Sequence, residues 1–171
     1  MEEEKKVVMA WAQCKIEIGK MGAGDTMAET LTEVGRVKDK TTALTSDLGT
    51  ALESYASGHK LIAREYPEEQ LTVNTTVVEP SDELLELLGI SDESGKVRSH
   101  YIEGYFSIVI TPKHKGAKGI KAPKCQITYS PAFGEETGNE CTLAFSITKT
   151  SELGDEENYW YERFRTTTEL A

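Results

Sequence analysis

The fold is decided by the stretch Cys141-Thr142-Leu143-Ala144-Phe145-Ser146-Ile147. Its large apolar side chains fall on every second residue, which is the period of a β-strand with one dry face and one wet face. Outward from this stretch, the same period returns three times along the chain. The matching apolar sets are Cys14, Ile16 and Ile18, then Phe106, Ile108 and Ile110, and then Cys125, Ile127 and Tyr129. The sequence therefore predicts several strands that share one dry face.

Other stretches indicate further strands by their composition. Residues 71–78 are rich in β-branched side chains, residues 59–65 form a second expected strand, and the segment from Pro67 to Gln70 is typical of a turn, so we expect an antiparallel hairpin. Residues 159–168 alternate aromatic and charged side chains and are expected to form one last strand. The connections between the later strands are expected at proline and glycine residues, which are Pro112, Gly116, Gly119, Pro123, Pro131, Gly134 and Gly138.

One short helix is predicted at residues 81–88. Ser81 is suited to cap the exposed amides of a helix, and Asp82 and Glu83 lie at the positive end of its dipole. Gly89 provides the stop. The four leucines of this stretch predict that the helix covers an open face of the sheet, because two turns of helix are not stable alone in water.

Together these elements predict a mainly β chain. Seven or eight strands and one short flanking helix, at about residues 81–88, indicate an antiparallel β-sandwich or partly closed barrel. The length of 171 residues predicts a single domain over residues 1–171, with flexible termini. Residues 25–58 are polar and are interpreted as a long excursion or loop. We expect this segment to pack on a partner or carry a site, because an ordinary loop has about four to six residues.

The composition limits the possible partners. The chain has 29 acidic and 19 basic residues, and its net charge of −10 disfavours an extended contact with nucleic-acid phosphates or an anionic membrane. The longest apolar stretch, residues 7–12, is far shorter than the roughly 18 residues that span a bilayer. The acidic start at Glu2, Glu3 and Glu4 is unlike an export signal, so we expect a cytoplasmic protein without membrane contact.

The charges are unevenly distributed. Acids are concentrated around the predicted helix, at Asp92 and Glu93, and again within residues 152–157, whereas the segment from Pro112 to Lys124 has five lysines and no acid. Such patches of opposite sign favour head-to-tail docking between copies of the chain. The candidate subunit-interface residues are Lys113, Lys115, Lys118, Lys121, Lys124, Glu79, Asp82, Glu83 and Glu86. The alternative is a solvated lysine turn that protects a sheet edge from aggregation.

Signatures of catalysis and of cofactor binding are incomplete or missing. Residues 89–97 have five residues between their glycines where a phosphate-binding loop requires four, and Val97 stands where that loop requires a hydroxyl. The start Gly22-Ala23-Gly24 of a dinucleotide-binding pattern is broken by Met27. The three cysteines contain no C-x-x-C pair and are interpreted as core residues. We therefore expect no enzyme activity, no catalytic residue, no cofactor and no metal site.

Three weaker groups each allow two interpretations. The isolated histidines His59, His100 and His114 are interpreted as surface residues rather than as catalytic groups or ligands. Residues 155–158 either hold a hard cation or form a solvated acidic turn, and the turn is favoured. Aromatic residues form either a ligand cage or, by preference, core and interface packing. These residues are Trp11, Tyr159, Trp160, Tyr161 and Phe164.

The order of the elements resembles that of phage major tail tube proteins. The resemblance covers residues 11–164 and begins with the strand Trp11-Ala12-Gln13-Cys14-Lys15-Ile16-Glu17-Ile18-Gly19, which the long polar excursion and a strand pair follow. Its most telling part is the strand, short helix and stop of Val77-Val78-Glu79-Pro80-Ser81-Asp82-Glu83-Leu84-Leu85-Glu86-Leu87-Leu88-Gly89. Long antiparallel strands complete the pattern.

The resemblance implies a structural subunit of a phage or prophage tail. Subunits of this family form hexameric rings that stack into a tube with an acidic lumen, through which DNA passes without specific binding. The related inner-tube protein of type VI secretion shares the architecture. The implied partners are copies of the chain and other tail proteins, and the implied location is the virion tail, or the cytoplasm of the bacterial host before assembly. The excursion at residues 25–58 corresponds to the segment that reaches a neighbouring subunit, and the lysines of residues 113–124 would face outward or between subunits.

A second class of function remains open from the sequence. A non-catalytic β-sandwich binding module would recognise a carbohydrate or a protein partner through the aromatic C-terminal segment. Its discriminating residue is Trp160.

Overall fold

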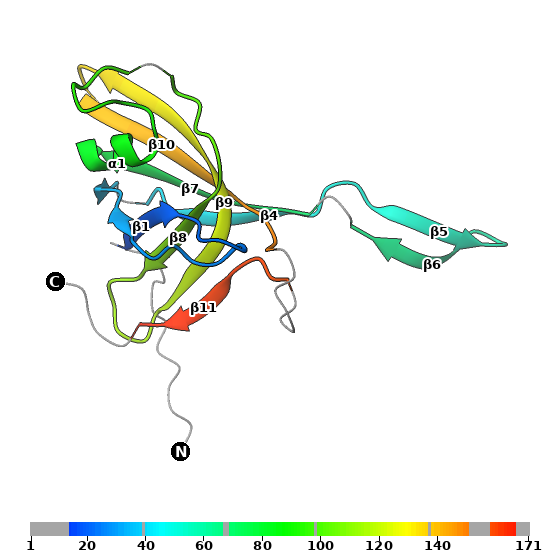
Figure 1. The fold of residues 1–171 in the computed structure, drawn as a ribbon. Coiled ribbons are helices and arrows are strands. Elements are labelled where there is room, and N and C mark those ends of the chain that lie inside the picture. Colours follow the sequence, from blue (N-terminus) through cyan, green and yellow to red (C-terminus); the bar gives the residue numbers. More distant parts are fainter. Residues whose placement is uncertain are drawn as a thin grey trace.

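The alternating strands form a sheet that curls into a half-barrel (Figure 1). The computed structural model describes residues 14–38, 40–66, 69–97, 99–136, 138–150 and 158–166. Within these residues, nine strands form one antiparallel sheet in the order β2-β1-β8-β9-β10-β7-β3, with β11 beside β9 and β4 beside β7, and β5 and β6 form a separate pair. The strands are β1 (Lys15–Lys20), β2 (Thr32–Glu33), β3 (Arg36–Val37), β4 (Ala43–Asp47), β5 (Leu52–Ala56), β6 (Lys60–Glu65), β7 (Gln70–Val78), β8 (Phe106–Thr111), β9 (Lys118–Gly134), β10 (Gly138–Ile147) and β11 (Glu162–Arg165). The expected mainly β fold, a partly closed antiparallel barrel with one short helix, is confirmed.

The alternation within β10 places one of its faces in the core. Cys141, Leu143 and Phe145 are fully buried, whereas the residues between them are exposed or half-buried. β10 lies between β7 and β9, and Phe145 stands opposite Val73 on β7 and Ile127 on β9. Both partners are buried as well, so the dry faces of three neighbouring strands form one continuous apolar surface.

The predicted strands at residues 14–18 and 106–110 are neighbours in the same sheet. Ile16 and Ile18 of β1 lie opposite Ile110 and Ile108 of β8, and all four are fully buried. β8 is covered on both faces, which buries Ser107 as well. The Ser107 hydroxyl donates to the carbonyl of Pro123 and accepts from the backbone N–H of Ala28, at 2.9 Å in each case. This buried polar group is therefore satisfied, and it ties the segment before β2 to the sheet.

The prediction of turns at Gly119, Pro123 and Pro131 is wrong, because one strand, β9, runs through all three. Pro123 lies where the register between β8 and β9 shifts, and such an irregularity tolerates the missing N–H of proline. Pro131 lies beyond the residues of β9 that pair with β8. At this position β9 pairs with β10 and not with β8, so the missing N–H of Pro131 removes no hydrogen bond to β8. The last predicted strand is confirmed as β11, which pairs with the first residues of β9.

Helix α1 (Asp82–Leu87) forms where its capping residues predict it. The Ser81 hydroxyl oxygen accepts a hydrogen bond from the backbone N–H of Leu84 at 3.2 Å. Gly89 adopts a positive φ of 74°, which ends the helix without strain. Leu84 and Leu88 are buried in the core, so the helix covers one end of the half-barrel, as its leucines predict.

The predicted hairpin of residues 59–65 and 71–78 has the right strands but the wrong partners. β6 pairs with β5, whereas β7 pairs with β10, β3 and β4. The apolar face of β7 needs a long buried neighbour, and β10 provides one, whereas every residue of β6 is exposed.

The interpretation of residues 25–58 as a loop is also wrong in part, because β2, β3, β4 and β5 lie within it. Pro67 and Glu68 of the predicted turn, and the predicted flexible ends at residues 1–13 and 167–171, lie outside the described residues.

Candidate assembly surfaces

A two-stranded ribbon projects from the half-barrel and forms an arm, which we define as residues 48–66. At its base, β4 pairs with β7 down to the partners Asp47 and Gln70. The chain then continues into β5, turns at residues 57–59 and returns along β6. Figure 1 shows this ribbon extending away from the sheet, on the side opposite α1. The arm thus includes the C-terminal part of the predicted excursion.

The arm is unusually apolar for a solvent-exposed ribbon. Of the eleven large hydrophobic side chains that are exposed among the described residues, six belong to the arm. These are Leu48, Leu52, Tyr55, Leu61, Ile62 and Tyr66, and Ile62 is 63% exposed. A concentration of exposed apolar side chains on one ribbon indicates an interaction site. An isolated two-stranded hairpin is also only marginally stable in water, so the arm is suited to contact a partner.

Polar contacts organise the face of the arm that carries Tyr55. The Arg64 Nε atom lies 2.9 Å from a carboxylate oxygen of Glu53, its partner across the ribbon. The Tyr55 hydroxyl donates to the same carboxylate, which lowers the pKa of Glu53 and raises the pKa of Tyr55. The rings of Tyr55 and His59 stack with centroids 4.6 Å apart. The register of β5 and β6 is irregular between Ser54 and Tyr55. Tyr55 therefore pairs with Leu61, and Ile62 has no paired residue on β5.

The five lysines predicted as interface residues lie at the end of the half-barrel that β11 borders. Lys113 and Lys115 belong to the connection between β8 and β9, and the other three lie on β9. Lys115, Lys118 and Lys121 are exposed, and the Lys121 ammonium lies 5.1 Å from the centre of the Phe164 ring. Lys124 instead forms an ion pair with Asp25 at 3.2 Å. The lysine group is therefore partly a surface patch and partly an internal contact.

The predicted acidic group surrounds α1 at the other end of the half-barrel. Glu79, Asp82, Glu83 and Glu86 are all exposed. In Figure 1 the helix lies far from the connection between β8 and β9 that carries Lys113 and Lys115. Within one subunit the two groups therefore do not meet, which is the arrangement that a head-to-tail contact between copies requires. The other predicted acids, at residues 152–157, lie outside the described residues.

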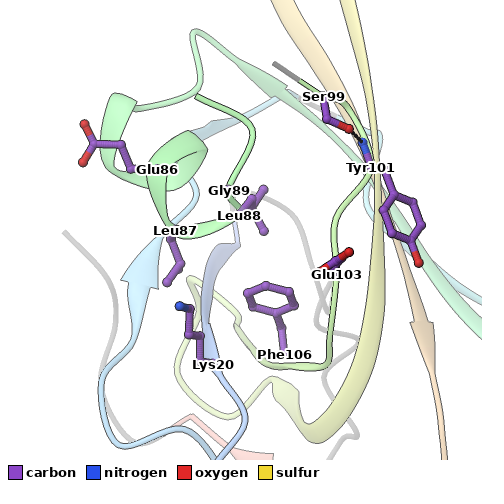
Figure 2. Close-up of a pocket in the computed structure, with 9 residues that line it drawn as sticks. All are labelled: Lys20, Glu86, Leu87, Leu88, Gly89, Ser99, Tyr101, Glu103 and Phe106. Carbon is purple, nitrogen blue, oxygen red and sulfur yellow. Dashed lines mark hydrogen bonds between the residues drawn. The ribbon is translucent and has the colours of Figure 1, made fainter. Parts of the chain in front are cut away.

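Two adjoining hollows beside α1 were not indicated by the sequence. The larger has a volume of about 380 Å³ and lies between the end of α1, the end of β1 and the segment before β8 (Figure 2). The second, of about 320 Å³, shares Lys20 and Leu87 with the first and extends along Glu29, Thr30 and Thr32. These residues come from separate elements, and no local motif joins them.

The remaining predicted groups lie in separate places. His59 is on the arm, His100 packs its ring 5.9 Å from that of Tyr129, and His114 lies in the connection between β8 and β9. Trp160 and Tyr161 pack against the core, and Phe164 packs on Gly119. Tyr159 is 37% exposed. Trp11 and residues 155–157 lie outside the described residues.

The three cysteines are buried free thiols, as their spacing predicts. Desolvation raises the pKa of Cys125 to about 12 and that of Cys141 to about 11, and it also raises the pKa of Cys14. Thiols of this kind are not nucleophilic at neutral pH. In the part of the chain that the structure describes, no group of three or more His, Cys, Asp or Glu side chains is placed to hold a metal ion.

The described residues include no helix with the length and hydropathy needed to span a bilayer. The chain matches no protein-family model. No curated protein matches its sequence.

Proposed function

We propose that this chain is a structural subunit of a phage or prophage tail tube, which self-assembles through its arm into stacked hexameric rings. The subunit acts by shape and charge, without a catalytic residue or a cofactor. DNA passes through the lumen of the tube without specific binding, and the further partners are other tail proteins. The subunit resides in the host cytoplasm before assembly and in the virion tail afterwards.

The single observation that carries this proposal is the arm. It exposes six large apolar side chains on a ribbon that two strands alone stabilise poorly. The arm points away from the rest of its own subunit, so only another molecule can cover it, and we propose that this molecule is a second copy. A contact between an arm and a different surface of the next copy is heterologous, and heterologous contacts build rings and filaments rather than closed dimers.

The charge distribution supports the same proposal. A net charge of −10 makes the subunit repel phosphate, which favours a lumen along which DNA slides. The lysine group and the acidic group lie at opposite ends of the half-barrel, so that the lysine end of one subunit faces the acidic end of the next in a stack. The order of strand, short helix and glycine stop, on which the resemblance to tail tube proteins depends, supports the tube in particular.

Electron microscopy tests this proposal directly. We expect negatively stained samples of concentrated protein to contain rings or tubes, and antibodies against the chain to label the tail of the parent virion along its length. Assembly is expected to weaken at high salt, because part of the contact is ionic. Globular particles alone, together with a virion tail that the antibodies do not label, would contradict the proposal.

A second candidate function is supported by one hollow at the base of the arm. Trp160 lines a hollow of about 340 Å³ together with Gln70, Gln126, Ser146 and Thr148. An aromatic ring next to amide and hydroxyl groups is suited to bind the apolar face and the hydroxyls of a sugar. We therefore propose, as the alternative, a binding module that recognises a carbohydrate.

Binding measurements with Trp160 variants distinguish the two candidates. The alternative predicts saturable binding of a neutral oligosaccharide, which Trp160→Ala weakens while the circular dichroism spectrum keeps its β signal. Trp160→Phe, which keeps a ring, serves as the matched control. A panel of oligosaccharides with no saturable binder contradicts the carbohydrate module and leaves the assembly proposal untouched.

A further inference from the structure

The arm leaves open which surface of a second copy receives it. The tip of the arm, residues 57–62, is apolar and basic. It combines the exposed side chains of Leu61 and Ile62 with His59 and Lys60, and it contains no acid. A receiving surface must therefore offer some apolar lining and an excess of carboxylates.

The two hollows beside α1 have this chemistry. They adjoin each other, because both are lined by Lys20 and Leu87, and we call the pair of hollows the groove. Leu87 is half-buried, and Figure 2 shows its side chain directed towards Lys20, with the Phe106 ring beside them. The exposed acids at the groove are Glu29, Glu86 and Glu103, and Lys20 is the one basic residue among those that line it.

The arm of a subunit cannot occupy the groove of the same subunit. From Lys60 to the base of the arm the ribbon spans roughly 30 Å at the rise of an extended strand. This length points away from α1, which lies on the opposite side of the half-barrel (Figure 1). The groove of one subunit is therefore available only to the arm of another, and such a contact repeats from copy to copy.

We propose that the tip of the arm of one subunit docks into the groove beside α1 of the next subunit. In this contact Lys60 meets the carboxylate of Glu103, Leu61 and Ile62 cover Leu87, and Glu86, at the outer rim of the groove, adds to the negative charge that attracts the tip. The inference rests on the proposed function, because it names the surface through which the arm joins two copies.

Charge exchange tests the pairing. We expect Lys60→Glu to weaken assembly, measured by sedimentation velocity, by about tenfold in the association constant. Lys40→Glu makes the same charge change at an exposed residue outside the tip and is expected to leave assembly unchanged. The double variant Glu86→Lys/Glu103→Lys is expected to weaken assembly alone and to restore it when mixed with or combined with Lys60→Glu. Failure of this restoration would overturn the inference.

Crosslinking tests the same contact without relying on charge. The native cysteines are buried, so Ser57→Cys on the tip and Ser99→Cys in the groove provide selective sites for a short bis-maleimide. A mixture of the two variants is expected to give crosslinked dimers in much higher yield than either variant alone. Tip-to-tip crosslinking by Ser57→Cys alone would contradict the proposal.

The proposed function and the docking inference are contradicted by different results. If replacing residues 52–65 by a short Gly-Ser linker leaves assembly intact, the arm is not the assembly element, and the proposed function loses its main support. If that replacement abolishes assembly but the groove variants neither weaken it nor crosslink, the arm binds elsewhere and the docking inference alone is overturned.

Discussion

The Nζ atom of Lys124 on β9 lies 3.2 Å from the Oδ2 atom of Asp25, which precedes it by 99 residues in the chain. Both side chains are largely buried, with 19% and 13% of their surfaces exposed. The same ammonium group lies 4.6 Å from the centre of the Tyr105 ring. One of the lysines that charge patterning assigns to a subunit interface is thus used inside the subunit, where it holds the segment before β2 against β9.

Removing one member of this ion pair leaves the other charge partly buried without its partner. We expect Asp25→Asn to lower the free energy of unfolding by roughly 1–2 kcal/mol, less than for a fully buried pair. Asparagine tolerates the positive φ of 56° at this position, so backbone strain does not confound the comparison. Urea denaturation followed by circular dichroism measures the change. Glu17→Gln, which breaks the more exposed pair with Lys15, is the control and is expected to cost less than 0.5 kcal/mol.

Close packing at Gly119 attaches β11 to the sheet. A Cβ atom added there would lie 2.3 Å from the carbonyl oxygen of Ile110 and 2.5 Å from the Phe164 ring. Because the nearer atom belongs to the backbone, Gly119→Ala is expected to lower the free energy of unfolding by about 2–3 kcal/mol. Gly58→Ala, at an open position with a φ of 84°, is the control and is expected to cost about 1 kcal/mol. Equal losses in the two variants would show that packing at Gly119 is not tight.

The buried thiols make stability depend on alkaline pH. Their pKa values in the folded chain, about 12 for Cys125 and about 11 for Cys141, lie above the ordinary value of 9.0. The unfolded thiols therefore ionise first, so the stabilisation is complete below pH 9 and is lost as the pH rises towards the folded pKa values. We expect the free energy of unfolding to fall between pH 9 and 11 more steeply in the wild type than in Cys125→Ala. Identical slopes would contradict the assignment.

Elements with a strong local pattern could be predicted from the sequence. The dry faces of β1, β8 and β10, and the caps of α1, follow from residues adjacent in the chain. Strand pairing could not be predicted in the same way. β6 and β7 are sequence neighbours, yet β7 pairs with β10, whose buried Phe145 and Cys141 lie opposite Val73 and Val77. The turns predicted at the prolines of β9 were wrong for a similar reason. Whether a strand tolerates a proline depends on which neighbouring strand pairs with it at that residue, and the sequence does not show this pairing.

The candidate surfaces also differ in whether the sequence predicts them. The uneven charge was visible in the sequence, because it depends only on composition along the chain. The apolar arm was not, because the sequence predicts residues 59–65 only as one strand of a hairpin with residues 71–78, and the fold is needed to show that β6 is exposed along its whole length. The groove beside α1 was likewise hidden, since Lys20, Glu86 and Glu103 come together only through tertiary structure.

The arm gives the most direct prediction about assembly. Ile62 is 63% exposed in the subunit, so Ile62→Ser is expected to leave the free energy of unfolding of the monomer within about 0.5 kcal/mol of the wild-type value. If a second copy buries this side chain, the same variant removes roughly 2 kcal/mol from each contact, which weakens association more than tenfold. Light scattering coupled to size exclusion, over a range of protein concentrations, measures the change. The control is Phe133→Ser, which removes an apolar side chain outside the arm that is even more exposed than Ile62. If Phe133→Ser weakens assembly as strongly as Ile62→Ser, general surface hydrophobicity rather than the arm drives association.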